Sequence, residues 1–230
     1  MKTKIALAAS AAVLGYTWFA AANATHFEGV YIGLHGGFGI ADADYVHFQP
    51  LLPQTEPLSF SDAAAVGGGQ LGVRFDIGPD WILGLEATYT AGTIDDTVGA
   101  DPAIVLDRSR SIEISDQFTA VLQLGHSWGD WLVYIKGGYA NAQIDTYSNI
   151  ISSGQLTSTS SDRESGWTAG VGIDHAIAPN VTLGLSYDYS SYSPDDRLNV
   201  QVAPFLAATT HIQNIDANVH LVTARLSWTF

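Results

Sequence analysis

The chain has 230 residues, of which 47% are hydrophobic, 11% are aromatic and only 14% are charged, against about 25% charged residues in an average soluble domain. Its formal net charge of -14 opposes nucleic-acid binding, which needs a basic surface, and its hydrophobic fraction is too high for a disordered chain. The absence of cysteine excludes a disulfide framework, a zinc–cysteine site and a thiol nucleophile.

The first 24 residues have the pattern of a secretory signal peptide. Lys2 and Lys4 give a positive start, residues 5–15 are apolar, and Ala22-Asn23-Ala24 forms a small-x-small cleavage site. We therefore predict a signal peptide over residues 1–24 and a single barrel domain over residues 25–230. A transmembrane anchor is the alternative, which we disfavour because the apolar stretch is interrupted and no stop-transfer pattern follows.

Beyond residue 24, apolar residues alternate with small or polar residues at a period of two, which predicts β-strands. Eight such runs follow one another, and the run at 112–128 is the least regular. They cover residues 30–40, 70–77, 81–89, 112–128, 131–140, 167–174, 181–189 and 222–230. We expect each strand to be near the ~9–11 residues that a tilted transmembrane strand needs.

The connections between these strands alternate in length. Residues 78–80, 129–130 and 178–180 are suited to tight hairpin turns. Between the other strands lie long polar segments, which we expect to be loops, at 41–64, 91–110, 143–164 and 190–216. Short turns at one rim and long loops at the other are typical of an outer-membrane barrel, with both termini on the short-turn side.

The two faces of the strands differ in composition. One face is apolar with aromatic residues at the strand ends, as in membrane girdles: Trp81, Tyr89, Trp131, Tyr139, Tyr187, Tyr189 and Trp228. The other face is mainly Gly, Ser and Thr, which suits a narrow lumen. We therefore predict an all-β fold, an eight-stranded antiparallel transmembrane β-barrel with up-and-down meander topology. A soluble lipocalin-like or streptavidin-like barrel is the alternative, and the aromatic ends oppose it.

Seven charged residues have the parity of the inward face. They are Arg74, Asp76, Glu86, Lys136, Asp174, Asp188 and Arg225. Arg74 and Glu86 lie on facing strands, close in register. An uncompensated buried charge costs several kcal/mol, so we expect a paired network. We favour a structural plug, and a gated or narrow ion path is the alternative.

Most remaining acids fall in the segments expected to be loops. They are Asp42, Asp44, Glu56, Asp62, Asp95, Asp96, Asp101, Asp107, Asp145, Asp162, Glu164, Asp195 and Asp196. We expect a solvated, mutually repelling acidic surface. Binding of divalent cations or basic host ligands is the alternative, although no EF-hand spacing occurs.

No motif predicts a metal, a cofactor or a catalytic site. The glycine-rich run 67–72 satisfies GxGxxG but continues into an alternating strand rather than a helix. The seven histidines lack metal-ligand spacing. His126 and Ser127 are adjacent, so a strand turns them to opposite faces and they cannot share a proton.

Three stretches carry a family resemblance: residues 134–140, residues 166–176 running on to 179–189, and the C-terminal 226–230. In them the chain resembles the small outer-membrane β-barrel proteins of Gram-negative bacteria, the opacity/porin-like family whose barrel is similar to the OmpA transmembrane domain. The resemblance implies that Leu226, Trp228 and Phe230 form the signal read by the barrel-assembly machinery. One departure is that Gln117, Thr119 and Gln123 stand on the fourth strand, where many relatives carry inward arginines.

The expected function follows from this resemblance. We predict a structural and surface role in the cell outer membrane, with long acidic loops presented outside for adhesion or host interaction. A small porin is the alternative, and a lipid-modifying enzyme is a less favoured one. We expect a monomer whose partners are outer-membrane lipid, lipopolysaccharide and the assembly machinery, with no nucleic acid and with the extracellular ligand left open.

Overall fold

The protein is a single closed β-barrel in the computed structural model, which describes residues 27–47, 57–99, 108–150, 156–192, 197–199 and 211–230. Its strands are β1 (Gly29–His47), β2 (Pro57–Gly78), β3 (Trp81–Ala91), β4 (Ile94–Gly99), β5 (Arg108–Trp128), β6 (Trp131–Ile150), β7 (Leu156–Ala178), β8 (Val181–Tyr192), β9 (Arg197–Asn199) and β10 (His211–Thr229). The predicted signal peptide lies outside the described residues. No helix in the described ranges is long and apolar enough to cross a membrane.

The barrel is an antiparallel meander that closes on itself. The strand order is β1-β2-β3-β5-β6-β7-β8-β10, and β10 pairs with β1 from Tyr31↔Thr229 to His47↔Gln213. β4 prolongs the line of β3 along β5, and β9 adds a short pairing to β10. The turns after β2 and β5 contain Asp80 and Gly129 with positive φ angles of 63° and 58°. The predicted eight-stranded barrel and its three tight hairpins are confirmed.

The part of the barrel next to these turns has an apolar outer face, and we call it the belt section. Along β1, for example, Ile32, Leu34 and Phe38 are 56%, 70% and 68% exposed, while Tyr31, next to Ile32 on the opposite face, is buried. Aromatic side chains end the apolar face on both sides, including Trp81, Trp131 and Trp228 near the turns and Tyr89, Tyr139 and Trp167 at the other limit. This outward apolar face rules out the soluble-barrel alternative.

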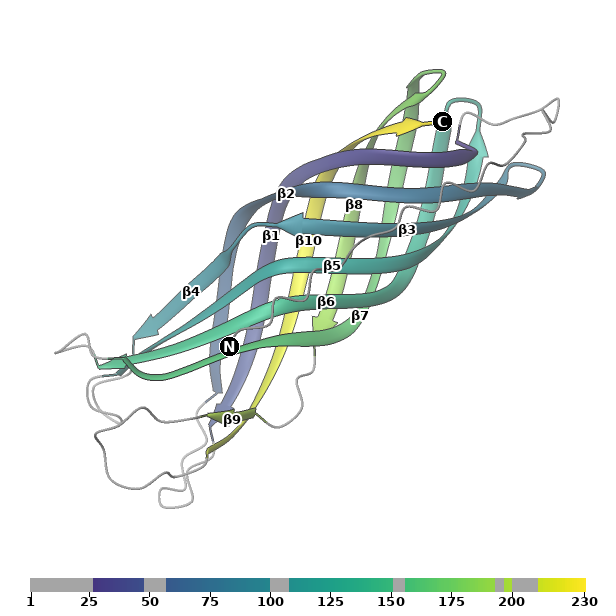
Figure 1. Cartoon of the computed structure of the whole chain (residues 1–230). Helices are drawn as coiled ribbons and strands as arrows, with labels where there is room; N and C mark the ends of the chain where they lie inside the picture. The colour runs from purple at the N-terminus through teal and green to yellow at the C-terminus, as the bar shows by residue number, and fades with distance from the viewer. Residues whose placement is uncertain (1–26, 48–56, 100–107, 151–155, 193–196, 200–210) are drawn as a thin grey trace, which may run out of the picture.

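Beyond the second aromatic limit the strands continue, and we call this part, at the lower left of Figure 1, the extension. β6 runs from Tyr139 on to Ile150, a path of roughly 35 Å at ~3.3 Å per residue. The segments predicted as loops therefore consist largely of paired strand, because β1 continues to His47, β2 begins at Pro57 and β7 begins at Leu156. The loop prediction was wrong for these residues.

The interior of the extension is an apolar core. Its buried side chains come from seven strands and pack in one cluster: Ala41, Val66, Ile94, Ile114, Ala140, Ala142, Ile144, Tyr192, Ala217, Val219 and Leu221. Outward positions at this level are polar, such as Asn141 and Gln143 on β6. In the extension the polar and apolar faces are therefore exchanged relative to the belt section.

Between the two sections the strands bend, as Figure 1 shows for β1, β2 and β6. Four glycines on these strands and on β7 lie against the neighbouring backbone. A Cβ on Gly37, Gly68, Gly138 or Gly166 would overlap the carbonyl oxygen of Val222, Tyr89, Ala120 or Ser191, respectively. Glycine permits the tight bending that closes a narrow barrel, because it has no side chain to collide there.

Candidate functional site: the barrel lumen

The lumen is blocked near the turn end by an apolar layer. Phe27, just before β1, is fully buried and packs with Ile82, Leu132 and Tyr134. Ala176 lies against the same cluster. Because these side chains fill the turn-end mouth, the chain segment preceding β1 serves as part of the plug.

Above this layer, buried ion pairs cross the lumen. The Arg74 Nη2 atom lies 2.7 Å from Asp174 Oδ2, and Lys136 Nζ lies 2.9 Å from Asp188 Oδ1. Glu86 forms an ion pair with Arg225 and lies 3.8 Å from Lys136 Nζ through Oε1. Three cations and three carboxylates thus neutralise one another in a space closed to lipid. Such pairing offsets the desolvation cost of the individual charges.

Tyrosine and glutamine side chains link these ion pairs into one network. Tyr31 donates its hydroxyl to Glu86 Oε2 at 2.6 Å, and Arg225 Nη1 donates to the Tyr134 hydroxyl at 3.0 Å. Arg74 stacks over the Tyr31 ring at 4.6 Å and donates from Nε to Gln123 Oε1 at 3.4 Å.

Each of the eight barrel strands contributes at least one member of this network. The members are Tyr31 (β1), Arg74 (β2), Glu86 (β3), Gln123 (β5), Tyr134 and Lys136 (β6), Asp174 (β7), Asp188 (β8) and Arg225 (β10). We call it the eight-strand network. It fixes all strands to one another across the lumen as well as along the wall.

Glycines make room for the large members of the network. Tyr31 faces Gly72 across β1 and β2, and Tyr134 faces Gly172 across β6 and β7. A Cβ at either glycine would collide with the facing tyrosine ring. These two glycines therefore leave the space that the two tyrosine rings occupy in the lumen.

Six of the seven charges predicted for the lumen meet in this network, and one does not. Asp76 is exposed near the turn end and accepts a hydrogen bond from the Gly78 backbone N–H at 3.0 Å. Its parity is inward, because it pairs with the buried Ile82, but it lies at the turn-end rim of the barrel, where its side chain is exposed. The expected proximity of Arg74 and Glu86 does not give an ion pair, since Arg74 binds Asp174 and Glu86 binds Arg225 and Lys136.

Sequence reasoning missed Tyr31, Tyr134 and Gln123 as network members. Their signal was present in the chain, because all three have inward parity in a face otherwise made of small residues. Gln123 occupies one of the positions where an arginine was expected from the family resemblance, and there it accepts the Arg74 Nε–H. Its Nε2 has no hydrogen-bond partner in the structure.

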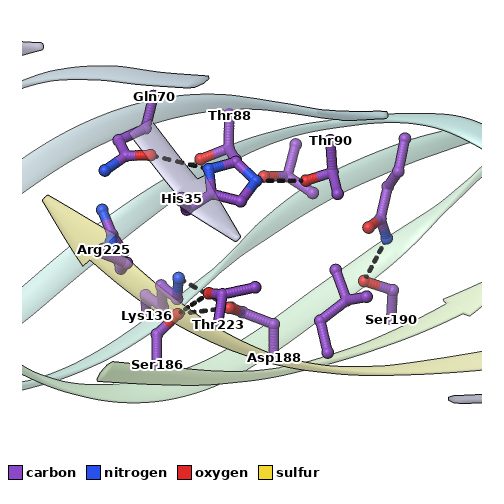
Figure 2. A pocket seen from close by; sticks show the side chains of 13 residues that line it. His35, Gln70, Thr88, Thr90, Lys136, Ser186, Asp188, Ser190, Thr223 and Arg225 are labelled. Atoms are coloured by element: carbon purple, nitrogen blue, oxygen red, sulfur yellow. Dashed lines mark hydrogen bonds and ion pairs between the residues drawn. The ribbon is translucent and has the colours of Figure 1, made fainter. Parts of the chain in front are cut away.

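Next to the network lies a small cavity of about 20 Å³, lined by uncharged polar side chains together with the network members Lys136, Asp188 and Arg225 (Figure 2). His35 reaches Gln70 Oε1 at 2.8 Å and Thr90 Oγ1 at 3.0 Å, and Ser186 reaches Thr223 at 3.1 Å. A cavity of this size holds one water molecule rather than a solute. The apolar core of the extension then closes the lumen from above.

Tyr192 joins the polar layer to the core of the extension. Its hydroxyl accepts a hydrogen bond from Gln117 Nε2 at 2.5 Å, and its ring is fully buried. Burial raises the pKa of Tyr192 above its ordinary value, because the charged form would be poorly solvated there.

The histidines with described side chains are held by structural contacts. His126 faces outward between Trp81 and Trp128 while Ser127 is buried, as predicted from strand alternation. His175 stacks on Trp131 at 4.2 Å between ring centroids. Among the side chains that the structure describes, no group of three acids or histidines has the geometry of a metal site.

The remaining predicted residues lie at two surfaces. Leu226, Trp228 and Phe230 face outward at the end of β10, and the Phe230 backbone N–H donates to the Val30 carbonyl at 2.9 Å. Acids expected in loops instead belong to the strands of the extension: Asp42, Asp44, Asp62, Asp95, Asp96, Asp145, Asp162 and Glu164. Glu56, Asp101, Asp107, Asp195 and Asp196 lie outside the described residues.

Comparison with known proteins agrees with this architecture. The model of the outer membrane protein beta-barrel domain matches residues 6–230. The chain belongs to this family. Among curated relatives, the 31 kDa outer-membrane immunogenic protein of Brucella melitensis is 26% identical over 210 residues, covering 89% of this chain and 84% of the relative. Outer membrane protein P1 of Coxiella burnetii is 27% identical over 173 residues, covering 70% and 68%.

Solved structures support the fold of this outer-membrane barrel. The outer membrane protein OprG of Pseudomonas aeruginosa superimposes with a TM-score of 0.52 at 13% identity, covering 89% of this chain and 98% of that one. The outer membrane protease OmpT of Escherichia coli gives a TM-score of 0.57 at 9% identity, covering 89% and 97%. The family and its curated relatives place the protein in the cell outer membrane, and the apolar belt section is the part that lies in lipid.

Proposed function

We propose that this barrel is a non-conducting, non-catalytic envelope protein that holds a rigid extension above the outer membrane surface. The observation that carries the proposal is the filling of the lumen. An apolar layer, the eight-strand network, a polar layer and a second apolar core follow one another along the barrel. Neither an ion nor a substrate has a continuous aqueous path through these layers.

The orientation of the extension follows from the connections. Outer-membrane barrels place short turns in the periplasm and long connections outside the cell. The three short turns here lie at the belt end, so the extension rises from the outer leaflet. Its polar outer face and apolar core suit a structure surrounded by water.

The wall also argues against a catalytic role inside the barrel. His35 is near the Thr90 hydroxyl, but both line the cavity of about 20 Å³, which admits no lipid or peptide substrate. The described histidines on the outer face bind aromatic rings, backbone or, for His220, Tyr187 and Asp42. The hydroxyl among these outer contacts is the Tyr187 phenol, which lies 2.8 Å from His220 Nδ1, and no serine or threonine hydroxyl is among the contacts described for these histidines.

Planar-bilayer recording tests the proposal. The purified full chain is expected to give no single-channel conductance above background, with a known open porin inserted in parallel to validate the membrane. Steady conductance of the wild-type barrel contradicts the plug and supports the porin alternative. Incubation with lipid A followed by mass spectrometry is expected to leave every acyl chain in place, and loss or transfer of a chain contradicts the non-catalytic part.

A further inference from the structure

The hydrogen-bonded wall of the extension is interrupted along a seam between β2 and β4. The pairing of β2 with β3 ends at Gly67↔Ala91, whereas β2 stays paired with β1 as far as Pro57. β4 pairs with β5 from Ile94↔Ile114 to Gly99↔Ser109, and no ladder joins it to β2 within the described residues. Figure 1 shows β4 leaving the direction of β2. One edge of β4 therefore presents backbone donors and acceptors that no described strand pairs.

Two backbone irregularities shape the closed end of this seam. Gly92 has a φ of 140° and lies against Ala65 and Val66, and Asp116 has a φ of 50° where the β5 register shifts. The Tyr89 hydroxyl donates to Asp116 Oδ1 at 2.6 Å and fixes this bulge. Beside it lies a cavity of about 20 Å³, whose lining includes Val66, Ile94, Ile114, Val219 and Leu221. This space accepts a methyl-sized apolar group.

Cross-strand rows beside the edge determine which side chains an added strand would meet. On the inner face, Ile94, Ile114 and Ile144 lie directly opposite one another across β4, β5 and β6. On the outer face, Asp95, Glu113 and Asp145 form the adjacent row. Neighbours in such rows have Cβ atoms about 4.5–5.5 Å apart, close enough for side chains to interact. The next strand at this edge would extend both rows by one residue.

We propose that the free edge of β4 binds an extended peptide by strand addition, and that the peptide alternates basic and small apolar residues. Its backbone pairs with β4, as in other cases of β-augmentation. Its apolar side chains continue the isoleucine row toward the cavity of the seam, and its lysine or arginine side chains continue the acidic row. The proposal rests on the proposed function, because it needs the extension to stand outside the cell.

The same rows argue against a second copy of this chain as the occupant. Pairing of two β4 edges would bring one acidic row against another, and like charges directly opposite across strands are destabilising. Edges of this kind are blunted against self-association by charge. A cationic partner gains from the same charges, so the seam favours a basic peptide over self-pairing.

The test uses the full chain in lipid nanodiscs and a fluorescent seven-residue peptide that alternates lysine and valine. We expect saturable binding by fluorescence anisotropy that weakens as salt rises. A peptide with lysines and valines in separate blocks, and one with glutamate in place of lysine, are expected not to bind. N-methylation of alternate peptide amides, which keeps the charges and removes the hydrogen bonds, is expected to weaken binding at least about tenfold.

Variants of the chain locate the site. Asp95→Asn and Glu113→Gln are each expected to weaken binding roughly twofold to fivefold. Asp80→Asn, which removes an exposed acid in the turn after β2, at the opposite end of the barrel from the seam, is the matched control and keeps wild-type affinity. Amide hydrogen exchange is expected to slow in β4 on peptide binding.

Three results overturn the proposal: no binding of the alternating peptide, equal binding of the blocked or N-methylated peptide, or peptide-independent dimers in analytical ultracentrifugation. Heat-modifiable migration on gels confirms that every variant is folded. Conductance is measured on the same preparations. A closed barrel without peptide binding therefore refutes the seam alone, whereas an open channel refutes the proposed function.

Discussion

The belt section and the extension are built from the same strands with the same alternation, yet their interiors are opposite. In the belt section, charged and polar residues fill the lumen and Leu, Ile and Phe face outward. In the extension, Ile94, Ile114 and Ile144 are buried and polar residues face outward. The change occurs at the aromatic limit marked by Tyr89 and Tyr139. The same alternate positions of each strand thus face inward in both sections. Whether these inward side chains are polar or apolar depends on whether lipid or water surrounds the outer face.

This difference gives the two sections different sources of stability. The belt section depends on the eight-strand network. Removing one charged side chain from this network leaves its ion-pair partner buried and unpaired. The extension depends on packing of small apolar side chains. Substitutions inside the belt section should therefore lower the stability of the whole barrel, whereas substitutions inside the extension should loosen the extension alone.

The largest loss of folding stability is expected for Glu86→Gln. It removes the carboxylate that binds Arg225 and Lys136. Breaking a buried ion pair on one side costs about 3–5 kcal/mol, so the free energy of unfolding should fall by that amount. Urea unfolding in lipid vesicles, followed by tryptophan fluorescence, measures it. Asp76→Asn is the control, since Asp76 is exposed, and should change stability by less than about 0.5 kcal/mol. Equal effects of both variants would show that the network is not stabilising.

Ile144→Ala should loosen the extension without opening the belt section. Ile144 is fully buried, and truncation of such a side chain costs about 2–5 kcal/mol. We expect faster limited proteolysis of the extension, with unchanged heat-modifiable migration of the barrel. Ile135→Ala on the lipid-facing side of the same strand, where Ile135 is 60% exposed, should leave proteolysis unchanged. Loss of the gel shift in Ile144→Ala would mean that the two sections unfold together.

A smaller effect is expected at the bend between the sections. Gly138→Ala would push a methyl group into the Ala120 carbonyl, while in Gly137→Ala the added Cβ meets only the Thr168 carbonyl oxygen at 3.6 Å. Forced overpacking costs about 1–3 kcal/mol, so only the first variant should lower the urea midpoint. Two equal midpoints would show that the strand can bend without glycine at that position.

The smallest effect concerns alkaline pH. The pKa of Tyr192 is higher in the folded extension than in the unfolded chain, where it is near 10. The stability that the neutral Tyr192 side chain contributes is therefore fully present below pH 10, and it is lost as the pH rises through the pKa of the folded state. Tyr192→Phe should cost about 1 kcal/mol at neutral pH through the lost hydrogen bond to Gln117, and should flatten the alkaline decline. Proteolysis rates from pH 8 to 11 measure both effects. An equally steep decline in the variant would exclude Tyr192 as its source.

The belt section could be predicted from the sequence because Leu, Val, Ile and Trp on every second position give a strong signal. The extension could not, since its inward residues include Ala41, Ala140 and Ala142 and its outward residues are polar. Small inward residues between polar ones resemble a loop in any hydrophobicity pattern. Only the pairing with neighbouring strands shows that these segments are ordered sheet.

The lumen charges were found by parity, but their partners depend on distances across the barrel. Arg74 and Asp174 are far apart in sequence and lie on β2 and β7, so no local pattern connects them. Asp76 keeps its inward parity but lies at the turn-end rim, where it is exposed, and parity alone does not tell how deep in the lumen a residue lies. Sequence therefore identified most of the members and not their arrangement.

The position of Arg225 on the last strand has a consequence for biogenesis. Once β8 has been added, the three carboxylates Glu86, Asp174 and Asp188 face only the two cations Arg74 and Lys136, because Arg225 is supplied by β10. A barrel that lacks its final strand therefore holds an excess negative charge inside as well as an unpaired edge. When β10 pairs with β1, the excess charge is neutralised and the free strand edge is paired in the same step. Closure of the barrel is therefore expected to be cooperative.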